Sequence, residues 1–163
     1  TKRIFDIAES TNTRVIYASS SACNRWFGNP YSISKYVNEF IAPPNSVGLR
    51  FSTVWGEGAR GDMLVPQIQN KTLKFATQHK RDLIHVTDVV SAIQTIIDHP
   101  EQTGVFEVGT GKTIKVDELV AYNGLDVPIQ HGQDYELEEN LLPSHRLRAL
   151  GWAPKKDIMD SKL

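Results

Sequence analysis

The sequence lacks the residues that mark several large classes of protein. Its 163 residues include one cysteine, Cys23, which excludes a disulfide framework and a cysteine metal cluster. Its net charge of −1 provides no basic field for nucleic acid or for an anionic membrane. No apolar run approaches the roughly 20 residues that cross a bilayer. We therefore expect no nucleic-acid partner and no membrane partner, and a reducing cytoplasm is the expected location.

The histidines and the glycine-rich runs also lack the spacing of familiar sites. The five histidines show no metal-ligand spacing, so we expect no bound metal. Residues 108–113 (VGTGKT) end like a phosphate-binding P-loop, but Phe106 stands where that motif requires its first glycine. We interpret this run as a strand followed by a turn.

What the sequence does contain is an alternation of short helices and strands. Apolar spacing predicts helices at residues 1–11, 31–41, 87–99, 116–122 and 144–150, with a short helix after Pro66. Apolar and β-branched runs predict strands at residues 14–18, 46–51, 72–76, 83–86 and 105–108. The remaining expectations are Thr87 as a helix N-cap, a glycine-rich loop at 53–63, and an acidic, irregular segment at 123–143 in which 134–139 form a solvated face.

This order of elements indicates the fold class. Alternating helices and strands predict a parallel α/β sheet with helices on both faces. The chain opens on a helix with no strand before it. We therefore expect a partial sheet that lacks the usual first half of a doubly wound fold.

The main chemical signal is a tyrosine and a lysine four residues apart on a predicted helix. This spacing places Tyr31 and Lys35 on one face. Three serines, Ser19 to Ser21, stand at the end of the strand just upstream, and ligands of open α/β sheets bind at the C-terminal ends of strands. A phenol, an ammonium and a hydroxyl gathered there would form a proton-transfer site.

The chemistry of such a group follows from the properties of a phenol. A free phenol has a pKa of about 10, which is too high for a base at neutral pH. A nearby ammonium and a positively charged nicotinamide ring both favour the phenolate. A serine hydroxyl can hydrogen-bond the substrate oxygen and orient it for proton transfer. Because tyrosine and lysine are common residues, their spacing alone is weak evidence for a catalytic site. The assignment of a proton-transfer site depends on the serines and on the later segments.

Five segments resemble, in the same order, the extended short-chain dehydrogenase/reductase family. VIYASSSA (15–22) and NPYSISKYVNE (29–39) together resemble its serine–tyrosine–lysine core. Three segments resemble its substrate loop, its phosphate-arginine strand and a late strand and helix: GLRFSTVWGEGARGDM (48–63), RDLIHVTDVV (81–90) and VFEVGTGKTIKVDEL (105–119). LGWAP (150–154) resembles a final family segment. The likeness is greatest to nucleotide-sugar epimerases of the UDP-glucuronate 4-epimerase type.

The resemblance implies a role for each matching residue. Tyr31 would be the base that takes a proton from a sugar hydroxyl, Lys35 would favour its ionised form, and Ser21 would be the catalytic serine. The expected contacts of the cofactor NAD are Ser19, Ser20, Tyr31 and Lys35. The expected contacts of the nucleoside-diphosphate sugar are Thr53, Arg60, Phe75 against the base, and Arg81 at the diphosphate.

The resemblance also implies an architecture and an assembly. The fold would be a Rossmann-like doubly wound parallel sheet with a small α/β substrate-binding lobe. Residues 1–58 would form the C-terminal half of the NAD-binding domain, and residues 59–163 mainly the lobe, with Rossmann elements interleaved at 81–108. The family's glycine-rich pyrophosphate turn would precede residue 1 and is not in this sequence. Family members often dimerise through the helices that match 1–11 and 31–41, so we expect a homodimer.

The implied activity is NAD-dependent epimerisation of a nucleoside-diphosphate sugar through a transient keto sugar. The residues after Ser21 are Ala22-Cys23-Asn24, and the absence of a carboxylate there favours epimerisation or keto-reduction over dehydration. Two alternatives stay open. One is a reductase or dehydratase of the same family, and the other is a catalytically inactive module that binds nucleotide sugars.

Overall fold

The computed structural model describes residues 1–132, 137–161 and 163. The first half contains α1 (Lys2–Ser10), β1 (Val15–Ser20), the 3₁₀ turn η1 (Ser21–Arg25), α2 (Pro30–Ile41), β2 (Ser46–Phe51), β3 (Thr53–Trp55) and α3 (Leu64–Gln69). The second half contains β4 (Lys80–Arg81), β5 (Leu83–His85), α4 (Val86–Asp98), β6 (Gly104–Val108), β7 (Ile114–Lys115), α5 (Val116–Tyr122), β8 (Glu139–Asn140), α6 (His145–Ala149) and η2 (Ile158–Asp160).

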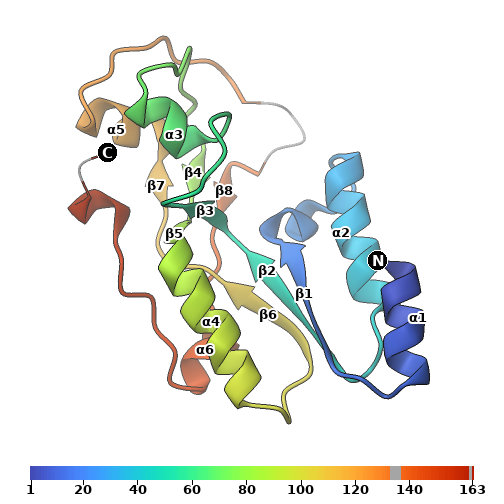
Figure 1. Ribbon diagram of the computed structural model, residues 1–163. Helices are drawn as coiled ribbons and strands as arrows, with labels where there is room; N and C mark the ends of the chain where they lie inside the picture. Colours follow the sequence, from blue (N-terminus) through green and yellow to red (C-terminus); the bar gives the residue numbers. More distant parts are fainter. Residues whose placement is uncertain (133–136, 162) are drawn as a thin grey trace.

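The central sheet is parallel and has the order β1-β2-β6 (Figure 1). Leu49 in β2 pairs with Ala18 on one side and with Phe106 on the other. Because successive residues of a strand point to opposite faces, the sheet presents one apolar face and one more polar face. The expected parallel α/β sheet is confirmed.

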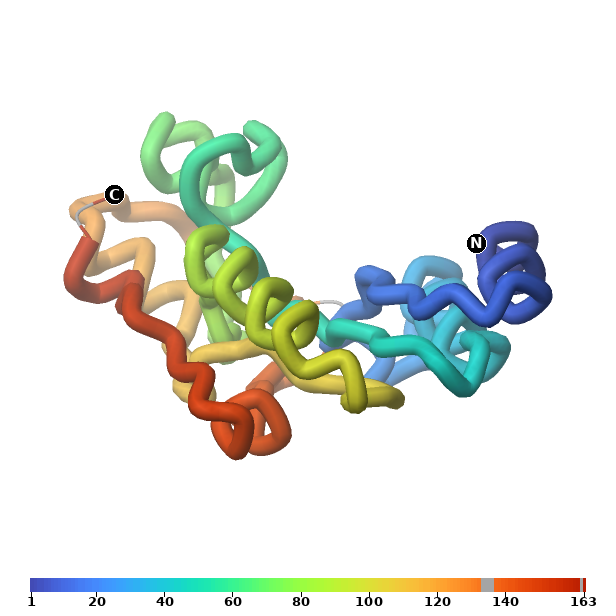
Figure 2. The backbone as a smooth tube through the Cα atoms, turned by 60° about the horizontal axis from the view of Figure 1, so that its bottom comes forward, coloured from blue at the N-terminus to red at the C-terminus, as the bar shows by residue number. Residues whose placement is uncertain are grey.

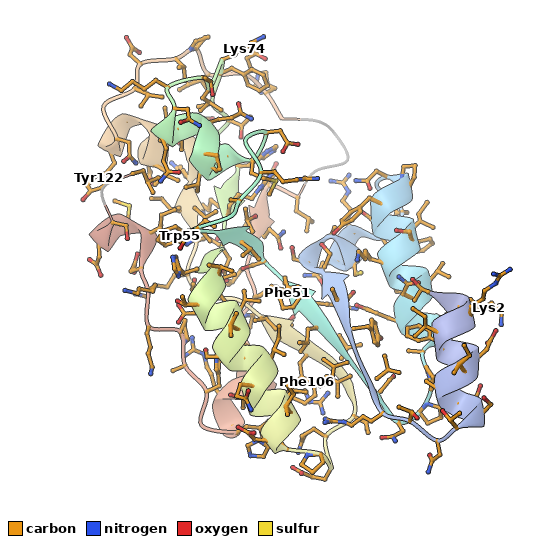
Figure 3. The ribbon with its side chains drawn as sticks, in the orientation of Figure 1. Lys2, Phe51, Trp55, Lys74, Phe106 and Tyr122 are labelled. Carbon is orange, nitrogen blue, oxygen red and sulfur yellow. The ribbon has the colours of Figure 1, made fainter. Side chains whose placement is uncertain are left out.

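The apolar face packs against α4 and buries the main core. Val47, Leu49, Phe106 and Val108 are at most 1% exposed, and they contact Ala92 and Ile96 of α4. Figure 3 shows Phe51 and Phe106 on the part of the sheet beside this helix. At about 25 cal/mol per Å², this burial is the main force that holds α4 on the sheet.

The other face of β1 and β2 is covered by α1 and α2. The ring of Phe5 in α1 meets the ring of Tyr17 edge-on, with centroids 5.2 Å apart. Gly48 lies opposite Tyr17 in the register, and a Cβ there would stand 2.5 Å from the Tyr17 hydroxyl oxygen. A residue without a side chain is therefore required for Tyr17 to lie across β2. Helices thus cover both faces of the sheet, as expected.

A second, smaller core lies beyond the C-terminal ends of the main strands. It is built from Trp55, α3, α5 and the last residues of the chain, with Ile68, Leu119 and Val120 at most 2% exposed. Two small sheets, β3-β5 and β7-β4-β8, connect it to the central sheet. Figure 2 shows α1 and α2 at one end of the molecule and α3 and α5 at the other.

Three local expectations were wrong. Residues 72–76 form no strand and make a single bridge, between Ala76 and Ile129. The loop expected at 53–63 begins with β3, whose pairing with β5 depends on residues 30 positions away. The N-cap of α4 is His85 rather than Thr87, because the His85 ring accepts a hydrogen bond from the Thr87 backbone N–H at 3.2 Å.

The acidic segment falls partly outside the described residues. The solvated face expected at 134–139 is described only from residue 137 onward, and residues 139–140 there form β8. Within the described residues, no helix is long and apolar enough to cross a membrane. The same residues contain no group of three or more histidine, cysteine, aspartate or glutamate side chains placed to hold a metal ion.

Candidate active site

The start of α2 determines where the tyrosine and the lysine stand. Asn29 is the N-cap, and its side-chain oxygen accepts from the backbone N–H of Ser32 at 2.9 Å and from its hydroxyl at 3.1 Å. Pro30 occupies the first turn, where its missing N–H is not needed. This cap fixes the beginning of the helix, so Tyr31 lies in the first turn and Lys35 one turn later.

The structure brings Tyr31 and Lys35 together at the end of β1. The Lys35 ammonium lies 5.7 Å from the centroid of the Tyr31 ring. It donates a hydrogen bond to the backbone carbonyl of Ala18 at 3.1 Å. Tyr31 is 55% exposed, so its phenol is open to a ligand. The expected pairing of a phenol with an ammonium on one helix face is present.

Ser21 lies directly after β1, at the start of η1. Ser20 caps this turn by accepting from the backbone N–H of Ala22 at 3.2 Å. Ser21 is 5% exposed, and its hydroxyl oxygen accepts a hydrogen bond at 2.7 Å from the side-chain amide of Asn140. Asn140 could not be predicted from the sequence, because it lies 119 residues from Ser21 in a stretch without a motif.

Ser19 belongs to a different group of side chains on the face of β1 that α2 covers. Its hydroxyl donates to Glu39, and it lies 3.4 Å from the Cys23 sulfur. Arg50 in β2 holds Glu39 by two hydrogen bonds, with Nε to Oε1 at 2.8 Å and Nη2 to Oε2 at 2.6 Å. We call Ser19, Cys23, Glu39 and Arg50 the closed cluster. The expected roles of Ser19 and Ser20 in cofactor binding stay predictions.

Burial and pairing set the charges in the closed cluster. Burial alone would raise the pKa of Glu39, but hydrogen bonds from Arg50 and Ser19, with the charge of Arg50, outweigh it and lower that pKa. The hydrogen bonds to Glu39 raise the pKa of Arg50. Burial raises the pKa of the Cys23 thiol, which is 3% exposed. A partly buried ion pair therefore lies beside a protonated thiol, which argues against a nucleophilic cysteine.

Arg81 lines three cavities, and two of them concern the candidate site. The first has a volume of about 400 Å³ and is lined by Phe75, Leu73, Val116 and Arg81. The second has a volume of about 180 Å³ and is polar, with Arg25, Asn29, Ser32, Arg81 and Asn140 among its lining residues. Ser32 follows Tyr31 in the sequence, Asn29 precedes Tyr31 by two residues, and Ala22 in the same wall follows Ser21. The structure thus brings Phe75 and Arg81 together and connects Arg81 to the serine–tyrosine region.

Arg60 and Thr53 lie elsewhere. Arg60 is exposed, forms an ion pair with Asp62 at 3.4 Å, and lines a separate cavity of about 270 Å³ beside Trp55. Thr53 lies in β3, and its backbone N–H donates to the carbonyl of Asp82 at 3.1 Å. The cavity of Arg60 does not include Arg81. The expected substrate contacts of Arg60 and Thr53 therefore stay predictions.

Comparison with known proteins identifies the family. No protein-family model matches the chain. It is 30% identical over 145 residues to an ADP-L-glycero-D-manno-heptose-6-epimerase of Brachyspira hyodysenteriae, covering 68% of this chain and 46% of that protein. The structure matches that of the Bordetella bronchiseptica enzyme WbmG, solved with NAD and UDP, with a TM-score of 0.80 at 20% identity, covering 99% of this chain and 61% of that one. The chain belongs to the extended short-chain dehydrogenase/reductase family.

Membership in this family does not by itself identify the reaction. This short-chain dehydrogenase/reductase chain is also 29% identical over 107 residues to a dTDP-4-dehydro-6-deoxyglucose reductase of Escherichia coli, covering 55% of this chain and 34% of that protein. The chain spans less than half the length of both curated relatives, 46% and 34%. The Rossmann-like fold expected from the sequence is confirmed.

Proposed function

We propose that this chain carries the proton-transfer and substrate-binding residues of an NAD-dependent epimerase of nucleoside-diphosphate sugars. The observation that carries the proposal is the pairing of Tyr31 with Lys35 on α2, a helix whose Ser32 lines the polar cavity together with Arg81 and with Ala22, the residue after Ser21. Ligands of open α/β sheets bind at this edge. The similarity to a heptose epimerase and to a structure that holds NAD and UDP supports it.

In this proposal the protein's own groups handle a proton. The Tyr31 phenolate takes the proton from a sugar hydroxyl as that carbon is oxidised, and returns it when the keto sugar is reduced on its other face. The Lys35 ammonium lies 5.7 Å from the centroid of the Tyr31 ring, on the same face of α2. The Ser21 hydroxyl donates to the same sugar oxygen and holds it in line with Tyr31. Inversion requires the planar keto sugar to turn within the cavity.

The groups around Tyr31 fit a nicotinamide ribose. An ammonium has three donors, and the Lys35 ammonium directs one to the Ala18 carbonyl, so the others can serve ribose hydroxyls. The exposed Tyr31 phenol leaves room for a flat ring beside it. NAD, when bound, supplies the acceptor and donor of hydride.

Two of the cavities that Arg81 lines fit a nucleotide sugar in outline. The larger, with Phe75 and Leu73 in its wall, suits a base and ribose, since an aromatic ring can stack on a base. The Arg81 guanidinium between them suits a diphosphate through charge-assisted hydrogen bonds. The smaller, polar cavity leads toward Ser21 and suits the sugar. We also propose that residues 1–58 belong to the NAD-binding domain and that 59–163 are mainly the substrate lobe.

We further propose a homodimer formed through α1 and α2, in the cytoplasm. These helices expose large apolar side chains that the chain itself does not cover: Ile4 at 63%, Ile7 at 64%, Val37 at 44% and Phe40 at 84%. An apolar patch of this kind marks an interaction surface. Sedimentation of wild type and of Phe40→Glu tests it, and a monomeric wild type would contradict it.

The test of the proposed activity is turnover by the full-length protein. It is incubated with NAD and a panel of nucleoside-diphosphate sugars, and the products are separated and identified. We expect one sugar to be converted to its epimer without net consumption of NAD. Unchanged sugars, with nucleotide-sugar binding retained, would instead indicate an inactive binding module.

A reductase of the same family is the second candidate. The relation to the dTDP-4-dehydro-6-deoxyglucose reductase favours it. A reductase consumes reduced cofactor in proportion to product and releases it, whereas an epimerase regenerates its cofactor in each turnover. Stoichiometric oxidation of added NADH or NADPH in the presence of a keto sugar would select the reductase.

A further inference from the structure

The side chain of Asn140 lies at the junction of the central sheet and the smaller lobe. It comes from β8, whose register pairs Asn140 with Arg81 of β4. Its backbone carbonyl accepts from the Asp82 N–H at 3.0 Å, so its backbone is fixed. Its side-chain amide reaches across to Ser21, 119 residues earlier, and donates to the hydroxyl oxygen at 2.7 Å. Asn140 also lines the polar cavity of about 180 Å³ together with Arg81.

This hydrogen bond restricts the direction of the Ser21 proton. A serine hydroxyl has one O–H donor and two acceptor lone pairs, whereas an amide NH₂ can only donate. The Asn140 amide therefore fills a lone pair of Ser21 and cannot receive its proton. Within the described residues, no acceptor for that proton lies at hydrogen-bond distance. The proton is left to be donated to a ligand.

One polar atom of the Asn140 side chain is buried in this position without a hydrogen bond from the described residues. This atom is the side-chain oxygen. An unsatisfied buried acceptor loses its hydration without compensation, and each such group in a folded protein requires an explanation. The contact with Ser21 offers a functional reason for an asparagine at this point.

We propose that Asn140 is a positioning residue for Ser21: its amide fixes the Ser21 hydroxyl so that the hydroxyl proton points at the oxygen of a bound sugar. The inference rests on the proposed function, since it assigns Asn140 to the proton-transfer step described above. It also links the two parts of the molecule, because the lobe that lines the substrate cavities supplies the group that orients the catalytic hydroxyl.

A double-mutant cycle tests whether Asn140 acts through Ser21. Turnover of the nucleotide sugar is measured for wild type, Asn140→Ala, Ser21→Ala and the double variant. Loss of one orienting hydrogen bond corresponds to roughly a tenfold decrease in kcat, with KM within about twofold of wild type. In the Ser21→Ala background the same change is expected to lower kcat by less than about twofold. Equal losses in both backgrounds would overturn the proposal.

Two further variants separate positioning from folding. Asn140→Asp keeps the shape and removes the donor, so we expect it to lose kcat as Asn140→Ala does. Glu139→Ala changes the other residue of β8, whose carboxylate accepts from Thr113 at 2.7 Å and pairs with Lys80, and we expect wild-type kcat. Thermal unfolding of each variant checks that it folds. A wild-type kcat in Asn140→Asp, or an equal loss in Glu139→Ala, would contradict the proposal.

The outcomes distinguish this inference from the function on which it rests. Absence of turnover by the wild-type protein would refute the proposed function, and this inference with it. Turnover by wild type together with undiminished turnover by Asn140→Asp would refute only the role of Asn140.

Discussion

Two polar clusters share the end of β1 and differ in how completely their groups are paired. In the closed cluster, Glu39 is bound by Arg50 and by Ser19, and the side chains of Glu39 and Arg50 are 7% and 22% exposed. In the open cluster, which we define as Ser21, Tyr31 and Lys35, Tyr31 is 55% exposed, and the buried Ser21 hydroxyl donates to no acceptor among the described residues. The closed cluster uses its charges within the protein, whereas the Tyr31 phenol and the Ser21 proton remain available for chemistry.

One helix face carries members of both clusters. Tyr31, Lys35 and Glu39 follow one another at intervals of four residues along α2. Residues four apart lie on the same face, one turn from the next. This row of side chains begins with Tyr31 at the ligand-binding edge of the sheet and ends with Glu39 beside β2, where Arg50 hydrogen-bonds the Glu39 carboxylate. The ion pair therefore fixes the helix that presents the phenol, so changes at Glu39 and at Tyr31 should affect stability and turnover separately.

The largest expected effect follows the removal of the phenol. Tyr31→Phe deletes the group that accepts the proton, and general acid–base catalysis is worth roughly 10²- to 10⁴-fold in rate. We expect turnover to fall by about 10³-fold. The ring is mostly exposed, so the free energy of unfolding is expected to change by less than about 0.5 kcal/mol. Steady-state kinetics and urea denaturation of the same preparation measure both, and a variant with near wild-type turnover would remove Tyr31 from the mechanism.

The next effect concerns the ion pair. Glu39→Ala leaves the Arg50 guanidinium largely buried without its carboxylate, and breaking a buried pair in this way costs about 3 kcal/mol. We expect urea denaturation to show a loss of that size. The matched control replaces both charges, as Glu39→Leu with Arg50→Met, and is expected to recover most of the stability. A single variant as stable as wild type would show that the pair does not hold α2.

The same carboxylate predicts how stability depends on pH. The pKa of Glu39 in the folded protein lies below its ordinary value of 4.5. The ionised carboxylate therefore makes its full contribution to the free energy of unfolding above pH 4.5, and this contribution is lost as the pH falls through the folded-state pKa. Unfolding free energies measured from neutral to acidic pH should therefore decline more steeply for wild type than for Glu39→Gln. If the free energy of unfolding fell equally with pH in the two proteins, the Glu39 carboxylate would not be the cause of the acid dependence.

The smallest effect is expected at the thiol. Cys23 lies 3.4 Å from the Ser19 hydroxyl, and burial raises its pKa, so it stays protonated at neutral pH. Cys23→Ala should lower the free energy of unfolding by about 1 kcal/mol and leave turnover unchanged. In the native protein the thiol should react with a disulfide reagent far more slowly than in denaturant. Loss of turnover in this variant would place the closed cluster in the chemistry.

Local signals predicted the parts of the fold that depend on neighbours in the chain. The strands β1, β2 and β6 and the helices α2, α4 and α5 were found from apolar patterns within a residue or two of their bounds. The short strands β4, β7 and β8 were missed, since each has two residues and exists only through pairing with distant segments. At α4 the sequence indicated Thr87, but a histidine ring made the cap instead.

In the candidate site, too, contacts within one helix could be predicted from the sequence, whereas contacts between distant elements could not. The pairing of Tyr31 with Lys35 follows from helical spacing and could be predicted from the sequence. The contacts of Glu39 with Arg50 and of Asn140 with Ser21 join different elements and carry no local motif. Both Arg60 and Arg81 lie in segments that resemble the family, so both were expected to contact the substrate. The sequence could not show that Arg60 lines a cavity separate from those that Arg81 lines.

The most direct test is a crystal structure of the full-length protein with its nucleotide sugar bound. The decisive quantity is the distance from the Tyr31 hydroxyl oxygen to the nearest sugar oxygen. We predict a distance of about 3 Å, with the Ser21 hydroxyl on the same oxygen and Arg81 at the diphosphate. A sugar seated beside Arg60, with the Tyr31 hydroxyl facing solvent, would contradict it.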